Sequence, residues 1–181
     1  EQLLRDDMSF QIAQAIDSAL IVGGGANEPD GVIATLGTAN GSLAGPTWAQ
    51  VLAIIEQVET ANALGSHNWL TTPGAKAKLR GTLKVNADAG AGFLMEGNTL
   101  GDYAVHTTNQ VPVDSGGGNS IIFGDWSQVL LGVWSELDIL VNPYSETAYT
   151  KGNVLVRAMA TCDIAIRHEE AFVWADDVPG L

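Results

Sequence analysis

Residues 153–174 read NVLVRAMATCDIAIRHEEAFVW, and this stretch constrains the architecture of the chain more than any other. From Asn153 to Arg167, apolar residues alternate with mixed ones over fifteen positions that contain no Gly or Pro. A period of two predicts a β-strand with one buried face. The face that we expect to be buried carries Val154, Val156, Ala158, Ala160, Cys162, Ile164 and Ile166.

The predicted strand is unusually long. Fifteen residues at about 3.3 Å each extend over about 50 Å, whereas ordinary strands contain about 3 to 10 residues. A compact domain of 181 residues has little use for such a strand. A subunit that reaches across neighbouring copies of itself does, so we interpret the segment as a brace for self-association.

The composition is that of a folded chain. The 181 residues are 46% hydrophobic and 16% charged, which suits one full core and a small extension. The low charged fraction also suits a protein that buries surface against partners. A net charge of −13 offers no general footprint for phosphate backbones, so it disfavours nucleic-acid recognition.

Cys162 is the single cysteine, and its place on the apolar face predicts a small core side chain rather than a nucleophile. One cysteine forms no internal disulfide. No apolar run reaches transmembrane length and no secretory leader opens the chain, so we expect no membrane partner.

Three helices are predicted, and the first spans residues 1–20. Its apolar side chains recur at every fourth position, at Leu4, Met8, Ile12, Ile16 and Leu20. No capping residue precedes its first turn, so we interpret it as part of a longer helix. Glycines 23–25 are expected to end it.

The other two helices have clear start signals. Thr47 and Gln50 form a Thr-x-x-Gln capping box before a core stripe, and Gly65 is the expected end. Thr72 and Pro73 start a shorter helix that closes at residue 81. The core stripe of the second helix consists of Val51, Ile54, Ile55, Val58 and Leu64. The basic residues of the third helix, Lys76, Lys78 and Arg80, are expected on a solvated face.

Strands are predicted at residues 69–71, 103–107, 121–123 and 128–141, with a helical turn near Trp126. Residues 86–100 are rich in Ala and Gly and predict a loop. Helices and strands that do not alternate regularly predict the α+β class.

Two short segments resemble parts of trypsin-like serine proteases. Ile21 to Gly24 reads IVGG, and Asp114 to Gly117 reads DSGG, which would make Ser115 the nucleophile. Leu20 precedes the first segment where a basic cleavage residue is required, and none of the three histidines, at 67, 106 and 168, has the family's context. We therefore interpret the second segment as a Gly-rich loop tip.

Metal and cofactor motifs are equally weak. Asn86, Asp88 and Glu96 suggest a calcium loop, but Ala91 stands where that loop requires Gly and Gly97 where it requires Glu. The histidines are too scattered for a zinc site, and the glycines at 23–25 follow a helix rather than a strand. The five tryptophans are expected to be core or interface residues. We predict no catalytic, cofactor-binding or metal-binding residue and no cofactor.

Four segments, in this order, carry a resemblance to a known family. They are DSALIVGGGANEPDGVI (17–33), LGDYAVHTTNQVP (100–112), IIFGDWSQVLLGVWSELDILV (121–141) and NVLVRAMATCDIAIRHEEAFV (153–173). Together they resemble the C-terminal portion of major capsid proteins of tailed bacteriophages and prophages of the Hong Kong 97 type. The family's N-terminal arm and extended loop are absent. Asp102 and Thr161 depart from the family pattern, in which a small or apolar and a basic residue respectively are common.

The resemblance implies a Hong Kong 97-like capsid fold with two domains. Residues 1–28 and 144–181 would form a peripheral domain, with a spine helix and the long strand, and residues 29–143 would form an axial domain. The implied protein is a non-enzymatic shell subunit that assembles into pentamers and hexamers around double-stranded DNA. Its implied partners are copies of itself, with scaffold, portal and DNA bound without sequence specificity. It would reside in the virion capsid after assembly in the bacterial cytoplasm.

Three alternatives stay open, and one of them is a stand-alone ligand-binding domain, which would need a sizeable closed pocket. An encapsulin-type bacterial compartment shell would share the fold and enclose an enzyme cargo instead of DNA. An acidic hydrolase that uses Ser115 would belong to a different class and would lose its activity on Ser115→Ala substitution.

Overall fold

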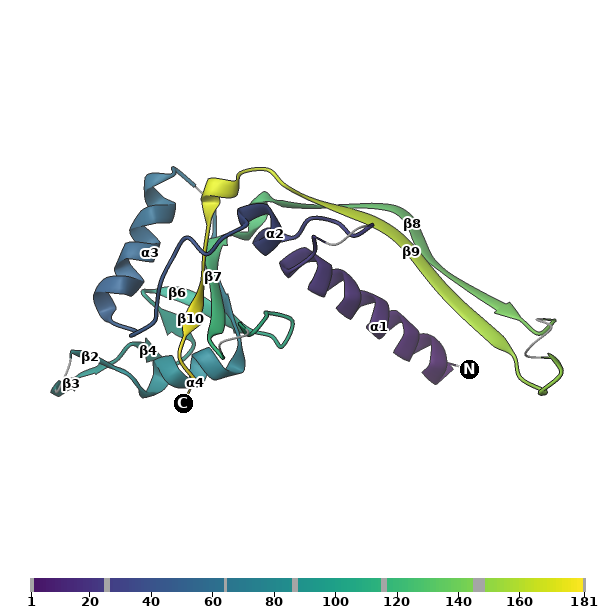
Figure 1. Ribbon diagram of the computed structural model, residues 1–181, viewed down its shortest axis with the longest axis horizontal. Coiled ribbons are helices and arrows are strands. Elements are labelled where there is room, and N and C mark those ends of the chain that lie inside the picture. The colour runs from purple at the N-terminus through teal and green to yellow at the C-terminus, as the bar shows by residue number, and fades with distance from the viewer. Residues whose placement is uncertain are drawn as a thin grey trace.

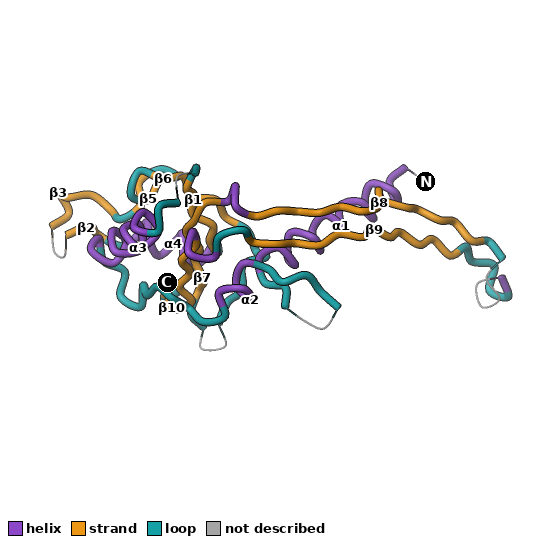
Figure 2. The backbone as a smooth tube through the Cα atoms, turned by 90° about the horizontal axis from the view of Figure 1, so that it is seen from above, coloured by secondary structure: helices purple, strands orange, loops and turns teal. Residues whose placement is uncertain are grey.

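The computed structural model describes residues 2–24, 27–63, 65–85, 88–114, 117–144 and 149–180. Figure 1 shows a compact unit from which a long two-stranded ribbon leads away, with helix α1 (Gln2–Ile21) alongside it. Figure 2 shows the same division in a view turned by 90°. The predicted α+β class and the predicted extended strand are both confirmed.

A six-stranded sheet forms the centre of the compact unit, with the order β10-β7-β1-β6-β5-β4. Strand β7 pairs antiparallel with both β1 and β10, while β1 runs parallel to β6. Every residue of β7 is buried. The strands are β1 (His67–Thr71), β4 (Met95–Glu96), β5 (Thr99–Leu100), β6 (Tyr103–Thr107), β7 (Asn119–Asp125) and β10 (Phe172–Val178).

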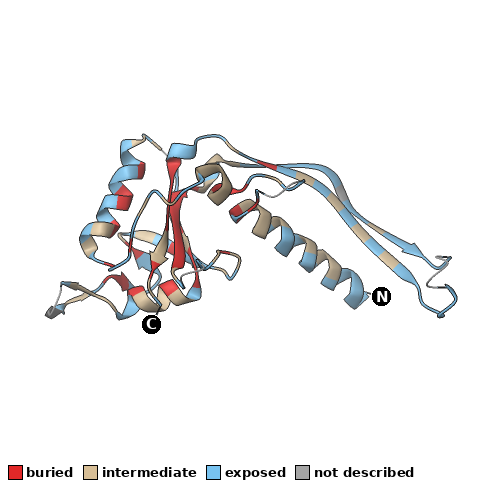
Figure 3. Cartoon of the chain, viewed as in Figure 1, coloured by how far each residue is buried: buried red, intermediate tan, exposed pale blue. Residues whose placement is uncertain are grey.

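Alternate side chains of this sheet enter two separate cores. Ile121 and Phe123 join Trp69 beneath α3 (Trp48–Thr60) and α4 (Pro73–Gly81). Ile122 enters the second core with residues of α2 (Val32–Leu36) and the end of α1. The compact unit is therefore a three-layer arrangement, and Figure 3 shows that the buried residues concentrate in it and not along the ribbon.

Helix α3 begins as the sequence predicts. The Thr47 side chain accepts a hydrogen bond from the Gln50 backbone N–H, and the Gln50 side chain accepts one from the Thr47 N–H. The predicted end at Gly65 is wrong. The helix ends at Thr60, because Asn62 already adopts a left-handed conformation with φ of 54°, which Asn tolerates better than most residues. Val51, Ile54, Ile55 and Val58 are buried as expected, and Leu64 lies outside the described residues.

Helix α4 has the predicted bounds, with Thr72 as its cap and Pro73 in its first turn. The loop predicted for residues 86–100 is wrong over its described part. Strands β2 (Leu83–Val85) and β3 (Asp88–Phe93) form a hairpin, and β4 and β5 pair next to it. Gly97, with φ of 60°, lies in the tight turn between β4 and β5, and Gly92, with φ of 78°, lies within β3.

The end of α1 is held by close backbone contact between two glycines. The N–H of Gly31 donates to the carbonyl of Gly23 at 3.1 Å. A Cβ atom on Gly31 would lie 2.8 Å from the Leu20 oxygen and 2.9 Å from the Gly23 nitrogen, too close for any side chain. The chain therefore reverses here and enters α2, a five-residue helix that the sequence did not predict.

The ribbon consists of β8 (Val129–Asn142) and β9 (Leu155–Ile166), each joined to the compact unit by a short 3-10 helix, η1 (Trp126–Gln128) or η2 (Glu169–Ala171). Strand β8 pairs with β9 in the ribbon, and β10 pairs with β7 in the central sheet. The 3-10 helix η2 separates β9 from β10.

Candidate functional site: an exposed apolar ribbon

The ribbon is a continuous antiparallel pair that runs from Val129 opposite Ile166 to Asn142 opposite Leu155. Its β9 strand has 12 residues, which at about 3.3 Å each span about 40 Å. The even-numbered side chains of β9 are half-buried or buried and the odd-numbered ones are exposed. The predicted alternation is thus confirmed, although the covered face is less buried than a core would be.

Two bulges make β8 curve relative to β9. The register shifts between Val133 and Ser135 and again between Ser135 and Asp138, so 14 residues of β8 face 12 of β9. Bulges bend a strand and redirect its side chains. The bend is visible along the ribbon in Figure 1.

Trp134 stands at the first bulge and is the most conspicuous side chain of the ribbon. Its ring lies over Gly132, where an added Cβ would be 3.4 Å from the ring, and 70% of Trp134 is exposed. The other four tryptophans are buried or half-buried. The ribbon also exposes Leu130, Leu131, Val133, Leu137, Leu140, Val141, Leu155 and Met159.

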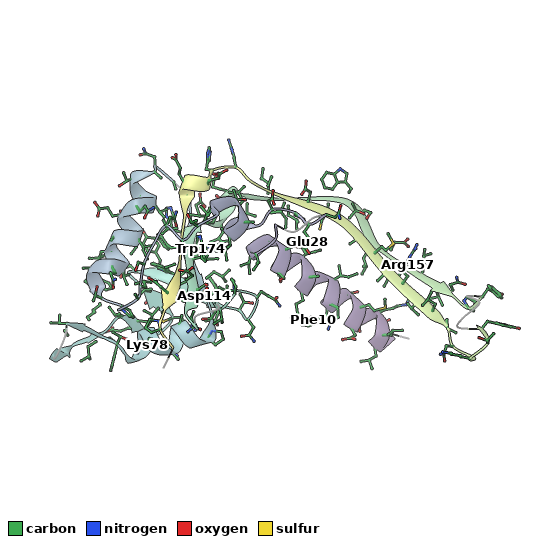
Figure 4. All side chains as sticks on the ribbon, viewed as in Figure 1. Phe10, Glu28, Lys78, Asp114, Arg157 and Trp174 are labelled. Atoms are coloured by element: carbon green, nitrogen blue, oxygen red, sulfur yellow. The ribbon has the colours of Figure 1, made fainter. Side chains whose placement is uncertain are left out.

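Helix α1 covers the opposite side of the ribbon only loosely. Ile21 is its one buried residue among those described, and Phe10 is 65% exposed. Leu4 and Met8 line an apolar hollow of about 320 Å³ together with Ile139, Val141 and Val156 of the ribbon. Figure 4 labels Phe10 on the helix and Arg157 on the neighbouring strand.

The molecule as a whole has more surface than a compact monomer of its size. Its accessible surface is 10501 Å². A globular monomer of 18.9 kDa would expose about 8,300 Å² by the usual scaling of area with mass. Because the excess includes the many exposed apolar side chains of the ribbon and α1, this surface has the character of an interface rather than of a solvated face.

Asp125 fixes the place where the sheet becomes the ribbon. Its carboxylate accepts hydrogen bonds from the backbone and hydroxyl of Ser127 and from the Gln128 amide, at 2.8 to 3.1 Å. Burial alone raises the pKa of Asp125, but the hydrogen bonds from Gln128 and Ser127 and the nearby His67 outweigh burial and bring the pKa below its ordinary value. The aspartate is therefore held as an anion that caps η1.

The weak catalytic and metal motifs are not assembled into a site in the described residues. Ser115 lies outside the described residues, and so does Asn86 of the suggested calcium loop. Of the histidines, His67 packs edge-on against Tyr103 with ring centroids 5.8 Å apart, whereas His106 and His168 are exposed. Within the described ranges, no three His, Cys, Asp or Glu side chains gather closely enough to hold a metal ion.

The expectation for Cys162 has a clear outcome. Cys162 is a free thiol on the half-buried face of β9, so it is less buried than expected. Asp177 accepts hydrogen bonds from the Ser42 hydroxyl and from the backbone N–H of Leu43. No described helix combines the length and the apolar character that a membrane span requires.

The sequence did not single out Trp134 or Asp125. A tryptophan inside a strand pattern fits core and interface equally well, and the bulges that expose Trp134 leave no periodic signal. Asp125 follows Phe123 and Gly124 in a segment that the resemblance did identify. Its capping role follows only from the turn into η1.

Comparison with known proteins gives consistent matches over nearly the whole chain. The model of the family described as Phage capsid family matches residues 1–177. The major capsid protein of Halomonas phage phiHAP-1 is 27% identical over 95% of this chain. The match covers 28% of that relative, so this chain spans less than a third of its length.

Solved structures share the fold at lower identity. A capsid chain of a native GTA particle matches with a TM-score of 0.74 and 22% identity, over 97% of this chain and 64% of the other. Mycobacterium phage Ogopogo gives a TM-score of 0.66 and 15% identity over 96% and 66%. The holo-SrpI encapsulin complex of Synechococcus elongatus PCC 7942 gives 0.58 and 16% over 97% and 66%.

Proposed function

The chain belongs to the phage capsid family, and on this premise we propose that it forms part of a structural subunit that self-associates into a closed icosahedral shell. Its fold is the Hong Kong 97 type predicted from the sequence. The observation that carries the proposal is the ribbon, because an isolated two-stranded hairpin is at best marginally stable in water. A ribbon that exposes this much apolar surface gains stability when a neighbouring copy covers it.

We propose heterologous contacts, in which the ribbon of one copy binds a different surface of the next copy. Heterologous contacts that close by rotation give rings, here pentamers and hexamers. We assign the compact unit, including β10, to the axial domain that surrounds the ring axis. The ribbon, with β8 and helix α1, is assigned to the peripheral domain.

The further partners are proposals of the same kind. Scaffold, portal and packaged double-stranded DNA would contact the shell without reading sequence, because a net charge of −13 offers no broad basic surface for base-specific docking. The assembled shell would be the virion capsid, built in the bacterial cytoplasm. The family supports a structural role over an enzymatic one, and the Ser115→Ala substitution remains the test for hydrolysis.

An encapsulin-type compartment is the second candidate, and the fold shared with the encapsulin complex is the observation that favours it. Mass spectrometry and nucleic-acid analysis of particles purified from the native source separate the two. Double-stranded DNA inside the particles supports the virion shell. An enzyme enclosed by the shell in place of DNA supports the compartment.

The exposed tryptophan gives the direct test of self-association. Trp134→Asp should reduce particle yield by about tenfold or more, because interface tryptophans often contribute about 2 kcal/mol or more to binding. Trp134→Phe, the matched control, should retain particles. Both variants should keep the far-UV circular dichroism and melting temperature of the wild type, since the ring is mostly exposed. Normal particles from Trp134→Asp, counted by electron microscopy and sedimentation, would contradict the proposed role of the ribbon.

A further inference from the structure

The two faces of the ribbon differ in what covers them. Odd-numbered side chains of β9 are exposed, whereas even-numbered ones are half-buried or buried, and we call these sides the odd face and the even face. Residues of β8 that lie directly opposite β9 residues point to the same side as their partners. Helix α1 packs against β9 on the even face, because Leu4 and Met8 share the apolar hollow with Val156.

Trp134 lies on the odd face, away from α1. Gly132 pairs with Asp163, an odd-numbered residue, so a Cβ on Gly132 would point to the odd face. That Cβ would meet the Trp134 ring at 3.4 Å, which places the ring on the same side. Because Gly132 has no side chain and 70% of Trp134 is exposed, the indole ring is available to another molecule. Tryptophans that enter a pocket on a partner are frequent anchors of interfaces.

The hollow on the even face has room for an aromatic ring. Its volume is about 320 Å³, and its lining is apolar apart from Arg5. An apolar cavity of about 150 Å³ binds benzene, so the hollow can accommodate the larger indole ring. Leu4 and Val141 of the lining are 48% and 51% exposed, which leaves the hollow open to a side chain from outside.

One molecule cannot place its own Trp134 in its own hollow. Trp134 is on the odd face, while Val141 pairs with Val156 on the even face. Val141 also stands seven positions further along β8, which corresponds to about 20 Å in a strand with bulges. An indole ring in the hollow therefore has to come from a different molecule.

The surface area of the single molecule suits two contacts of this kind. Its accessible surface of 10501 Å² exceeds the area expected for a compact monomer by about 2,200 Å². A standard interface buries about 800 Å² on each partner. A heterologous contact uses two different patches on every copy, one that inserts and one that receives. The excess is large enough for both patches.

We propose that Trp134 of one copy inserts into the hollow of the next copy, so that the odd face of one ribbon packs against α1 and the even face of another. The inserting and receiving surfaces differ, so the contact is heterologous and can repeat from copy to copy. It removes from water an aromatic side chain that is 70% exposed in the single molecule. This inference rests on the proposed shell function and names the surface that receives the ribbon.

Photochemical cross-linking tests which surface Trp134 meets. The photoreactive aromatic residue p-benzoylphenylalanine replaces Trp134, and isotopically labelled and unlabelled copies are assembled together and illuminated. Mass spectrometry should find links from position 134 to the hollow residues, with the two ends of each link on different copies. The same residue in place of Leu52, which is exposed on α3 away from the ribbon, is the control and should give no link to the hollow.

Filling the hollow tests the receiving surface separately. Leu4→Trp places an indole ring in the hollow and should lower particle yield by about tenfold or more, as the loss of an interface anchor does. Leu3→Trp, the matched control, introduces the same side chain at the adjacent position of α1, which is 85% exposed and does not line the hollow. Its particle yield should stay within about twofold of the wild type. Both variants should keep the far-UV circular dichroism of the wild type.

The outcomes separate this inference from the shell proposal. Links from position 134 to any surface other than the hollow, to position 134 of another copy, or within one copy would overturn the inference and leave the shell intact. Normal particle yield from Leu4→Trp would do the same. If a further segment of a longer subunit occupies the hollow, Leu4→Trp lowers the melting temperature of the unassembled subunit and the links lead elsewhere, which also overturns the inference. A wild-type protein that forms no particles would refute the shell proposal itself.

Discussion

At the scale of single residues, the segment Phe123, Gly124 and Asp125 shows how three neighbours do three different tasks. Phe123 enters the first core against Trp69, with ring centroids 4.3 Å apart. Gly124 leaves room for the Phe172 ring and for the carbonyl of Ala171, which a Cβ would overlap. Asp125 then ends the strand by capping η1. These three residues mark the point where the buried strand β7 ends and the ribbon begins.

The lowered pKa of Asp125 predicts that the free energy of unfolding depends on pH. Because its folded-state pKa is lowered, its ionised form stabilises the fold above the ordinary carboxyl pKa, and this contribution is lost as the pH falls through the folded value. Asp125→Asn places an amide N–H₂ near the Gln128 donor, and we expect it to cost about 1–3 kcal/mol at neutral pH. Urea unfolding at neutral pH and at about pH 3 should show the difference shrink in acid. Asp138→Asn on the exposed ribbon is the control, and an unchanged difference at both pH values would refute the role of the charge.

At the scale of elements, local signals and tertiary contacts contribute differently to each helix. Helix α3 has both a capping box and four buried side chains, so its start is set locally and its face by the core. Helix α1 has no comparable cap and one buried residue among those described, and its end is set by the contact of Gly23 with Gly31. The ribbon has no core of its own, and its curvature comes from the two bulges of β8.

Removal of the capping box at the start of α3 should measurably lower the free energy of unfolding. Thr47→Ala removes the acceptor for the Gln50 N–H and should lower the free energy of unfolding by about 1 kcal/mol. Thr60→Ala, at the exposed other end of the same helix, should change it by less than about 0.5 kcal/mol. Thermal melting followed by circular dichroism measures both. Equal melting temperatures for the two variants would show that the cap is dispensable.

At the scale of the whole molecule, two cores stabilise the compact unit, whereas the ribbon is held by the pairing of its two strands and has no core of its own. Strand β7 supplies alternate side chains to both cores, and β10 completes the sheet after the ribbon has returned. The ribbon leaves and re-enters at one place, where the Arg167 N–H donates to the Gln128 carbonyl at 2.9 Å. We therefore expect the compact unit to fold without the distal ribbon.

Removing the distal ribbon should separate folding from assembly. Residues 132–163 can be replaced by Asn-Gly, because Leu131 and Ile164 are paired and a two-residue turn of this type closes a hairpin. We expect cooperative unfolding within about 5 °C of the wild type and complete loss of particles. Differential scanning calorimetry and sedimentation measure the two properties. A truncated protein that still assembles would refute the assignment of the ribbon as a brace, and one that no longer folds would refute the independence of the compact unit.

Much of this architecture follows from the sequence alone, because the signals are local. The period of two in residues 153–167 specified the long strand, Thr47 with Gln50 specified the start of α3, and Thr72 with Pro73 specified α4. These features depend on neighbours within a few positions, where steric and hydrogen-bonding preferences act directly. The order of four short segments also indicated the capsid fold.

Only the tertiary structure determined how the pieces are partnered. Strand β10 joins the central sheet, β8 joins the ribbon, and residues 88–100 pair in short strands despite a composition typical of loops. The tertiary structure also places Ser127 and Gln128 where they donate hydrogen bonds to Asp125, and it leaves Trp134 exposed at a bulge. Strand pairing is a contact between distant positions, and the free energy that selects it comes from burial and backbone hydrogen bonds formed only when the whole chain closes.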